Sequence, residues 1–515
     1  MYLTQSLHRN LQQQPDRPLT IFGARVRTIA ESADRIARLG GALAALGVRR
    51  GDRVGMLGLN SDRYFEYLYA VPWIGAAVNP VNIRWSPVEI AYSLQESDTR
   101  VLLVDDVFAP MIPALRAQFP ELATVIFCGD GAQPADTLSY EGLIAEHEPI
   151  DDTRTGGSEL AGVFYTGGTT GYPKGVMLSH DNLIVSALGS VAAGDFVTRL
   201  GTVLHAAPMF HLADAAMWVA ANLSGSTHAI VPVFTPAGVA DAISAHRVTN
   251  LLLVPTMIQM LVDAPTTLDH DLDSVETITY GASPISEALL LRARKVFPQA
   301  RFTQAYGMTE VAPVATLLQP DDHDDPVLRR SAGRAVPHAE VRIVDPDDRE
   351  LPRGEIGEVV VRGDNVMLGY WNRPEDTAAA VRDGWMHTGD GGYMDERGYV
   401  FIVDRIKDMI ITGGENVYSA EVENALSNHP AVALCAVIGV PDAEWGERVH
   451  AVVVLHPGEQ ATEAELRDHC KTLIAGYKAP RTVEFAPELP MSGAGKILKR
   501  ELRKPYWDAD GSQVS

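Results

Sequence analysis

The chain has 515 residues, too many for one hydrophobic core, so two or more domains are expected. Its formal net charge is −23, from 43 basic and 66 acidic side chains. A surface of that sign repels polyanions and argues against nucleic-acid binding, although a small anion can still bind in a locally basic cleft. The 3 cysteines are far apart and form no CxxC pair, which argues against a disulfide framework and a zinc site and is typical of a reducing cytoplasm.

The sequence shows no segment for export or membrane insertion. Its start, MYLTQSLHRN, lacks the apolar core of a signal peptide. The most apolar stretch, at 251–262, is interrupted by Pro255, Thr256 and Gln259 and cannot span a bilayer. We therefore expect a soluble cytoplasmic protein, for which transient contact with a membrane surface and assembly into a homodimer both stay open.

Periodic apolar residues predict α/β architecture up to about residue 310. Thr28 and Glu31 have the spacing of a capping box, apolar residues then recur every three or four positions, and Gly47 ends the pattern, which predicts a helix at 29–46. The strand expected at 101–104 carries no polar residue, as in a parallel sheet covered on both faces. The other elements expected here are strands at 53–58, 250–254 and 277–280 and a helix at 61–69. This alternation indicates βαβ connections.

The pattern changes after about residue 330, where short alternating strands between glycine and proline turns predict a small antiparallel β unit. A compact tail follows Asp404. Its expected elements are helices at 420–427 and 463–474, strands at 431–440 and 450–454, and a basic loop and helix at 493–503. We place the boundary at Asp404–Arg405, which gives a large N-terminal domain of parallel α/β sheets at 1–404 and a small α+β C-terminal domain at 405–515.

The most informative segment reads YTGGTTGYPKG at 165–175. Its small residues and hydroxyls let backbone N–H groups and threonine side chains surround phosphate oxygens, and Lys174 adds a positive charge. It is not a Walker A loop, because no GKS or GKT follows at the required spacing. Strand-like flanks predict a hairpin loop over phosphate. The residues expected to contact phosphate are Thr166, Gly167, Gly168, Thr169, Thr170, Gly171 and Lys174.

With four further segments, this loop makes the chain resemble the adenylate-forming (ANL) superfamily of acyl-CoA synthetases, peptide-synthetase adenylation domains and luciferases. The segments are GASP at 281–284, YGMTE at 306–310, WMHTGD at 385–390 and SGAGKILK at 492–499. They stand in the family order along nearly the whole chain. The resemblance implies an AMP-forming acyl-CoA synthetase of the fatty-acid–CoA ligase family, which uses ATP, Mg²⁺ and coenzyme A and has a mobile C-terminal domain.

The resemblance assigns segment 306–310 to the adenine and the α-phosphate. It implies that Thr309 donates a hydrogen bond to that phosphate and that Glu310 helps to hold Mg²⁺, a hard cation that prefers carboxylate oxygen. Thr166 is the second residue expected near the metal. The residues expected along the adenine are Gly281, Ala282, Ser283, Tyr306, Gly307 and Met308.

The same resemblance implies that Asp390 binds both ribose hydroxyls, since an ionised carboxylate with two acceptor oxygens suits a vicinal diol. Arg405 is expected to hold the ribose from the other side, and Lys407 is a further candidate near the nucleotide. Asp408 fits a surface ion pair equally well.

Lys496 matches the catalytic lysine of the family. A carboxylate that attacks an α-phosphate brings two anions together, and an ammonium between them stabilises the charge that grows in the transition state. Lys499 and Arg500 follow on the same helix and are expected to be solvated.

In the family, the C-terminal domain rotates between the two half-reactions about a hinge that maps to Asp404. One orientation brings in Lys496, and the other presents segment 411–416 to the pantetheine tunnel. Gly413 and Gly414 suit that tunnel, because any side chain would narrow it.

His211, in the segment PMFH at 208–211, resembles the family histidine that borders the acyl pocket, where we expect a substrate gate and not a catalytic base. The pocket walls implied by the resemblance are mostly small and apolar. They are Ala213, Ala215, Ala216, Trp218, Ala282, Val311 and Ala312. Asp214 is the one nearby candidate to hold an amino group. A neutral, apolar monocarboxylate therefore fits best: a fatty acid first, with aryl, cinnamate-like and sterol side-chain acids left open.

Free coenzyme A is the expected acceptor, because no carrier domain follows Lys496 and the stretch 333–370 has no room for an insertion. Three rival functions stay open. An amino-acid adenylating enzyme would need Asp214 as an ammonium anchor, and a luciferase-like oxidation would share the motifs. A non-catalytic nucleotide-binding protein would be expected to have lost part of the catalytic set.

The loop departs from the family pattern at one position, since Gly167 stands where the family usually has serine. Gly167→Ser restores one hydroxyl, and one neutral hydrogen bond contributes roughly 0.5–1.5 kcal/mol. We expect it to lower the Michaelis constant for ATP by less than about tenfold, measured from initial rates. A large loss of activity would instead show that the loop requires glycine there.

Overall fold

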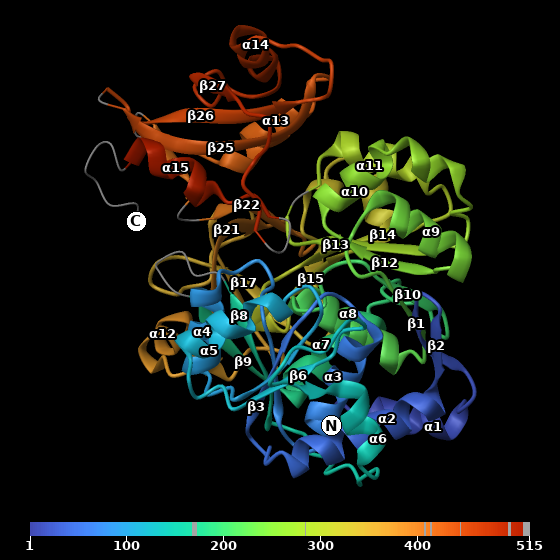
Figure 1. Cartoon of the computed structure of the whole chain (residues 1–515). Helices are drawn as coiled ribbons and strands as arrows, with labels where there is room; N and C mark the ends of the chain where they lie inside the picture. The colour runs from blue at the N-terminus through green and yellow to red at the C-terminus, as the bar shows by residue number, and fades with distance from the viewer. Residues whose placement is uncertain are drawn as a thin grey trace.

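The computed structural model describes residues 1–166, 173–283, 285–405, 408–412, 415–442, 444–492 and 496–507, with the backbone alone at 405 and 416. Strands alternate with helices through the first part of the chain, which confirms the predicted α/β class (Figure 1). The helices of this part are α1 (Gln5–Gln13), α2 (Ile29–Ala45), α3 (Asp62–Trp73), α4 (Pro87–Glu96), α5 (Ile112–Gln118), α6 (Tyr140–Glu146), α7 (His180–Ala192), α8 (Leu212–Leu223), α9 (Pro236–His246), α10 (Pro255–Asp263), α11 (Glu287–Val296) and α12 (Pro374–Ala380).

Two large sheets form the framework of this part, and both are parallel in their interior and antiparallel toward an edge. The nine-stranded sheet has the order β16 (Arg334–Ala335), β15 (Thr316–Leu318), β14 (Arg301–Tyr306), β13 (Thr277–Gly281), β12 (Asn250–Leu253), β10 (Thr202–His205), β11 (Thr227–Ile230), β1 (Pro18–Phe22) and β2 (Arg25–Thr28). The eight-stranded sheet has the order β19 (Gly369–Tyr370), β9 (Lys174–Ser179), β8 (Leu160–Thr166), β4 (Ala77–Pro80), β3 (Arg53–Leu57), β5 (Val101–Val104), β6 (Thr124–Phe127) and β7 (Leu138–Ser139).

A third, antiparallel sheet of five strands confirms the predicted β unit. Its strands are β17 (Glu340–Val344), β18 (Gly357–Arg362), β21 (Trp385–Met394), β20 (Val381–Arg382) and β22 (Val400–Arg405). The chain then enters the separate C-terminal part, drawn in orange to red (Figure 1). That part contains β23 (Ile410–Thr412), β24 (Glu415–Val417), α13 (Ser419–Ser427), β25 (Val432–Asp442), β26 (Gly446–Leu455), α14 (Glu463–Leu473), β27 (Thr482–Phe485) and α15 (Lys499–Trp507).

The connection between the two parts runs along β22, which pairs with β21 as far as Arg405. The next strand, β23, begins at Ile410 and belongs to the C-terminal sheet. We therefore keep the proposed boundary at Asp404–Arg405. Within the described part of the chain, every helix falls short of the length and apolar character that crossing a bilayer requires.

Local sequence signals explain several of these bounds. Thr28 accepts a hydrogen bond from the backbone N–H of Glu31, and the Glu31 carboxylate accepts one from the backbone N–H of Thr28, which confirms the capping box of α2. The helix α3 ends at Trp73, four residues past the end that was predicted at 69. Its last turn is buried on every side and therefore shows no amphipathic period.

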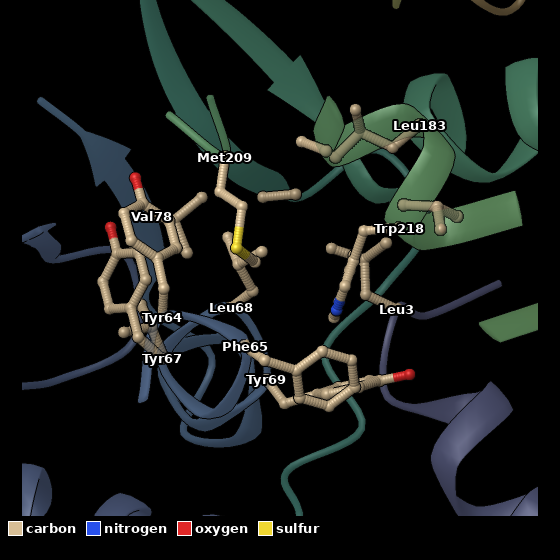
Figure 2. Packing of buried hydrophobic residues seen from close by; sticks show 14 of the residues in the cluster. Leu3, Tyr64, Phe65, Tyr67, Leu68, Tyr69, Val78, Leu183, Met209 and Trp218 are labelled. Carbon is tan, nitrogen blue, oxygen red and sulfur yellow. The ribbon is translucent and has the colours of Figure 1, made fainter. Parts of the chain in front are cut away.

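The helix α3 organises the core, because all its residues are buried and it contacts β3 and β4 of one sheet and β1 of the other. Figure 2 shows its aromatic side chains beside Met209 and Trp218. The ring of Trp218 lies 5.9 Å from that of Phe65 and 4.5 Å from that of Tyr69, between centroids. A helix in this position stabilises both sheets at once.

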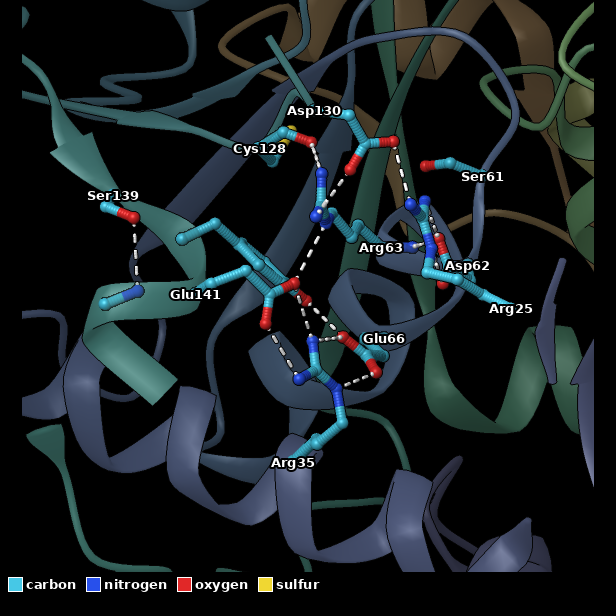
Figure 3. A network of polar contacts seen from close by, with 12 residues as sticks. Arg25, Arg35, Ser61, Asp62, Arg63, Glu66, Cys128, Asp130, Ser139 and Glu141 are labelled. Atoms are coloured by element: carbon cyan, nitrogen blue, oxygen red, sulfur yellow. Dashed lines mark hydrogen bonds and ion pairs between the residues drawn. The ribbon is translucent and has the colours of Figure 1, made fainter. Parts of the chain in front are cut away.

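The polar residues of α3 are paired in an ionic network (Figure 3). Arg35 of α2 bonds Glu66 at 2.6 Å and Glu141 of α6 at 2.9 Å, and the Tyr140 hydroxyl donates to Glu66 at 2.6 Å. The side chain of Glu66 is 2% exposed. The network thus compensates the charges that α3 carries into the core.

Removing Glu66 should leave Arg35 and Tyr140 without their buried acceptor. Breaking a buried ion pair from one side typically costs about 3–5 kcal/mol, so we expect Glu66→Ala to lower the free energy of unfolding by about 3 kcal/mol or more, measured by urea denaturation. The matched control is Asp34→Ala, which removes the exposed partner of Arg38. Its cost should stay within about 1 kcal/mol. Equal losses for the two variants would contradict a stabilising role for the network.

Candidate functional site

The phosphate loop lies between two paired strands. β8 ends at Thr166, β9 begins at Lys174, and these two residues are antiparallel partners. The flanks therefore form the hairpin that the sequence predicted. The loop residues Gly167, Gly168, Thr169, Thr170 and Gly171 lie outside the described residues.

The two adenine segments meet because their strands are neighbours. β13 and β14 pair in parallel, with Gly281 opposite Ala305, so 281–283 and 306–310 both follow the carboxyl ends of adjacent strands. Ligands bind at such ends in α/β sheets. A Cβ at Gly281 would lie 2.3 Å from the Ala305 carbonyl oxygen, so a side chain there would force the strands apart. Ala282 adopts φ +68°, a left-handed conformation that turns the chain away from the strand.

The segment 306–310 is held closely by its surroundings. A Cβ at Gly307 would lie 2.0 Å from the Pro313 carbonyl oxygen, so this position requires glycine. Met308 and Thr309 follow, and Thr309 opens a short 3₁₀ turn that contains Glu310. Glu310 is 5% exposed, and the Tyr370 hydroxyl donates to its Oε1 at 2.8 Å.

The residues expected to bind the ribose adjoin the same segment. The Tyr306 hydroxyl donates to Asp390 Oδ2 at 2.8 Å, although 84 positions separate the two residues. Asp390 on β21 is opposite Arg405 on β22. The structure thus brings Tyr306, Asp390 and the backbone of Arg405 together. Lys407, and the side chain of Arg405, lie outside the described residues.

Lys174 lies near Tyr370, the residue that donates to Glu310. Its Nζ is 3.2 Å from Asp376 Oδ1 and 5.1 Å from the centroid of the Tyr370 ring. Sequence reasoning missed Tyr370 and Asp376. The available signal was the run GYWNRPED at 369–376, in which aromatic residues precede a proline that can begin a helix, but it does not reveal the tertiary partners.

The loop of Lys496 rests against the N-terminal part. Arg84 Nη1 donates to the Ser492 carbonyl oxygen at 3.1 Å. Ser492 and Lys496 are bonded to each other, since Ser492 N donates to the Lys496 carbonyl oxygen at 2.6 Å and Lys496 N donates to Ser492 Oγ at 3.0 Å. Gly413 and Gly414, which were expected at the pantetheine tunnel, lie outside the described residues.

The expected hinge is bonded into the C-terminal part. Asp404 Oδ2 accepts a hydrogen bond from the backbone N–H of Ser419 at 2.6 Å. Lys499 hydrogen-bonds Ser419 Oγ and pairs with Glu423 at 2.8 Å. The prediction that Lys499 is solvated was therefore wrong, because its side chain closes α15 onto α13. Burial opposes its charge, but Glu423 and Asp404 outweigh this effect and raise the pKa of Lys499.

Asp408 is paired with Arg503 of α15. Its Oδ1 lies 2.6 Å from Arg503 Nη1, and the two side chains are 15% and 11% exposed. The sequence left open whether Asp408 forms a surface ion pair. It does form an ion pair, but both side chains are largely buried.

The acyl side begins at His211, which precedes α8 and packs on Phe210 with ring centroids 4.3 Å apart. Along α8, Ala213 is partly exposed, whereas Asp214 is 1% exposed. Asp214 Oδ2 lies 2.7 Å from His205 Nδ1, and His205 Nε2 lies 2.8 Å from His228 Nδ1. Asp214 is thus buried and paired with His205 through Oδ2, which argues against its use as an ammonium anchor for an amino acid.

Trp218 lies on the same buried face of α8, four residues after Asp214. Its ring packs on Phe65 and Tyr69 in the core. It was expected in the acyl pocket, and the structure packs it in the same buried cluster as Ala215, Val311 and Ala312.

The donor set around Glu310 fits a magnesium ion that arrives with ATP. Mg²⁺ is usually bound through one or two carboxylates together with substrate phosphates and water, rather than by a protein cage. Glu310 is a buried carboxylate held in place by a neutral donor, and β8 ends at Thr166, where the phosphate loop begins. No group of three or more His, Cys, Asp or Glu residues is gathered for a metal in the described ranges.

Known proteins match almost the whole chain. The family described as AMP-binding enzyme matches residues 7–371, and the AMP-binding enzyme C-terminal domain matches residues 421–496. The chain is 37% identical to the fatty acid–[acyl-carrier-protein] ligase ScoC of Streptomyces coeruleorubidus, over 100% of this chain and 98% of ScoC. It is 40% identical to a feruloyl-CoA synthase of Amycolatopsis sp, over 97% and 98% of the two chains.

Among solved structures, the anthranilate CoA ligase AuaEII in complex with anthranoyl-AMP superposes with a TM-score of 0.93 at 27% identity, over 99% of this chain and 98% of that chain. Agreement over the full length requires a similar arrangement of both parts. The chain therefore belongs to the adenylate-forming superfamily, in the family of AMP-forming acid–CoA ligases.

Proposed function

We propose that the enzyme activates an apolar monocarboxylic acid, with a fatty acid as the first candidate, and transfers the acyl group to coenzyme A. The observation that carries this proposal is the pairing of Asp214 with His205 at 2.7 Å inside the core. This pairing holds the one charged side chain of α8 in the core, so the helix that follows His211 offers mostly small apolar side chains and no exposed charge to bind a second carboxylate or an amine.

In the first half-reaction, an oxygen of the substrate carboxylate forms a bond to the α-phosphorus of ATP. The bond from that phosphorus to the bridging oxygen breaks, and pyrophosphate leaves with the electron pair. Lys496 stabilises the charge between the two anions, while Thr309 donates to the α-phosphate. Mg²⁺ would neutralise phosphate charge beside Glu310 and Thr166.

The nucleotide is oriented by contacts outside the reacting atoms. Asp390 binds the ribose, with Arg405 on the neighbouring strand, and Lys174 with the adjoining loop holds the pyrophosphate. In the second half-reaction, the C-terminal domain turns about Asp404, withdraws Lys496 and presents Gly413 and Gly414 to the pantetheine arm. The thiolate then attacks the acyl carbon, and AMP leaves.

The two half-reactions separate the role of Lys496 from a structural one. Lys496→Ala should abolish acid-dependent exchange between ATP and pyrophosphate, because it removes the cation between the reacting anions. It should spare thioester formation from supplied acyl-adenylate. The matched control is Lys504→Ala on α15, whose ammonium pairs with Glu501 at the surface and whose removal should change neither rate. Equal loss of both half-reactions in Lys496→Ala would overturn the assignment.

A panel of acids tests the substrate class, with AMP release measured in the presence of ATP, Mg²⁺ and coenzyme A. We expect the highest kcat/KM for straight-chain fatty acids. A cinnamate-type acid is the second candidate, since the chain is 40% identical to a feruloyl-CoA synthase. Preference for an aryl, sterol side-chain or amino acid would contradict the fatty-acid proposal. Release of no AMP with any acid would contradict catalysis itself.

The panel also tests the acceptor, because ScoC is named for transfer to an acyl carrier protein. We expect AMP release to require coenzyme A in catalytic turnover. Turnover with an acyl carrier protein at a higher kcat/KM than with coenzyme A would contradict that part of the proposal.

A further inference from the structure

Tyr370 occupies a position between two groups of the proposed nucleotide site. Its strand, β19, pairs antiparallel with β9, so that Tyr370 is opposite Val176 and Gly369 is opposite Met177. β9 is the strand that leaves the phosphate loop at Lys174. Tyr370 is 8% exposed, so its ring is fixed in the interior beside that strand.

The hydroxyl of Tyr370 is bonded to Glu310. It donates to Oε1 at 2.8 Å, and the backbone N–H of Met367 donates to the Glu310 carbonyl oxygen at 2.9 Å. One short segment therefore fixes both the backbone and the carboxylate of Glu310.

Lys174 packs over the ring face of Tyr370, with its Nζ 5.1 Å from the ring centroid. Lys174 also pairs with Asp376 at 3.2 Å, and Asp376 lies 3.5 Å from Arg373. The helix of Asp376, α12, is joined to Tyr370 because the Tyr370 N–H donates to Thr377 Oγ1 at 2.9 Å. One rigid side chain thus contacts both a cation next to the phosphate loop and a buried carboxylate.

We propose that Tyr370 is a positioning residue for adenylate formation. Its hydroxyl orients Glu310 toward Mg²⁺, and its ring holds Lys174 toward the pyrophosphate. The inference rests on the proposed roles of Glu310 and Lys174. A hydrogen bond that orients a metal-binding carboxylate commonly changes metal affinity by about 10–100-fold, because an unoriented carboxylate must be ordered when the metal binds.

Two substitutions separate the two contacts. Tyr370→Phe removes the hydroxyl and keeps the ring, whereas Tyr370→Leu removes both. Binding of the non-hydrolysable α,β-methylene analogue of ATP is measured by calorimetry at a series of Mg²⁺ concentrations and without Mg²⁺, alongside ATP–pyrophosphate exchange.

For Tyr370→Phe, we expect the Mg²⁺ concentration at half-maximal effect to rise about tenfold, with binding in the absence of Mg²⁺ unchanged. Tyr370→Leu should show the same rise and should in addition weaken binding without Mg²⁺ by about threefold, since Lys174 loses its ring contact. Exchange rates should fall in the same order and recover in part for Tyr370→Phe at high Mg²⁺.

The matched control is Tyr399→Phe in the β unit. The Tyr399 hydroxyl donates to Asp322 Oδ1 at 2.7 Å, the guanidinium of Arg334 lies 4.9 Å from the ring centroid, and the residue is 5% exposed. Tyr399→Phe therefore removes an equivalent hydrogen bond away from the site. Tyr399→Phe should leave the Mg²⁺ dependence unchanged, and a shift equal to that of Tyr370→Phe would overturn the proposal.

Glu310→Gln distinguishes failure of this inference from failure of the proposed function. If Glu310→Gln raises the Mg²⁺ requirement and Tyr370→Phe does not, the positioning role is refuted while the metal role of Glu310 stands. If Glu310→Gln leaves the requirement unchanged, both are refuted. If Tyr370 acts through Glu310, the double variant Glu310→Gln/Tyr370→Phe should need no more Mg²⁺ than Glu310→Gln alone. Additive effects of the two substitutions on the Mg²⁺ requirement would contradict action through Glu310.

Discussion

The nucleotide site depends on the parallel pairing of β13 and β14, since this pairing brings two segments of the site to one edge of the sheet. Gly281 lies so close to Ala305 that a Cβ would be 2.3 Å from the carbonyl oxygen. The register then places Tyr306 at the end of its strand, where its hydroxyl reaches Asp390 at 2.8 Å. Through β21 and β22, that contact links the N-terminal sheets to the strand that leads into the C-terminal part.

A second constraint is electrostatic, because a chain of net charge −23 must bind ATP and a carboxylate together. The two carboxylates proposed to face the nucleotide are each bonded by a tyrosine hydroxyl at 2.8 Å, Glu310 by Tyr370 and Asp390 by Tyr306. A neutral donor orients a carboxylate without cancelling its charge. These tyrosines therefore leave the charge of each carboxylate in place, which suits the roles proposed for Glu310 at the metal and for Asp390 at the ribose diol.

Much of this arrangement could be predicted from the sequence, and the features that were missed share one physical cause. The capping box of α2 and the hairpin around the phosphate loop are local patterns, and both were found. The sequence motifs also gave the superfamily. Burial of Lys499 was missed, because the direction of a side chain depends on which distant element packs on it. Tyr370 was missed for the same reason, since its partner is 60 residues away.

The central claim, that the acid reacts through a bond between its carboxylate oxygen and the α-phosphorus, can be tested by isotope transfer. The acid is labelled with ¹⁸O in both carboxylate oxygens and turned over with ATP and coenzyme A, and the products are analysed by mass spectrometry. The account predicts that each turnover leaves one ¹⁸O in AMP and none in pyrophosphate. Label in pyrophosphate or inorganic phosphate, or unlabelled AMP, would contradict it.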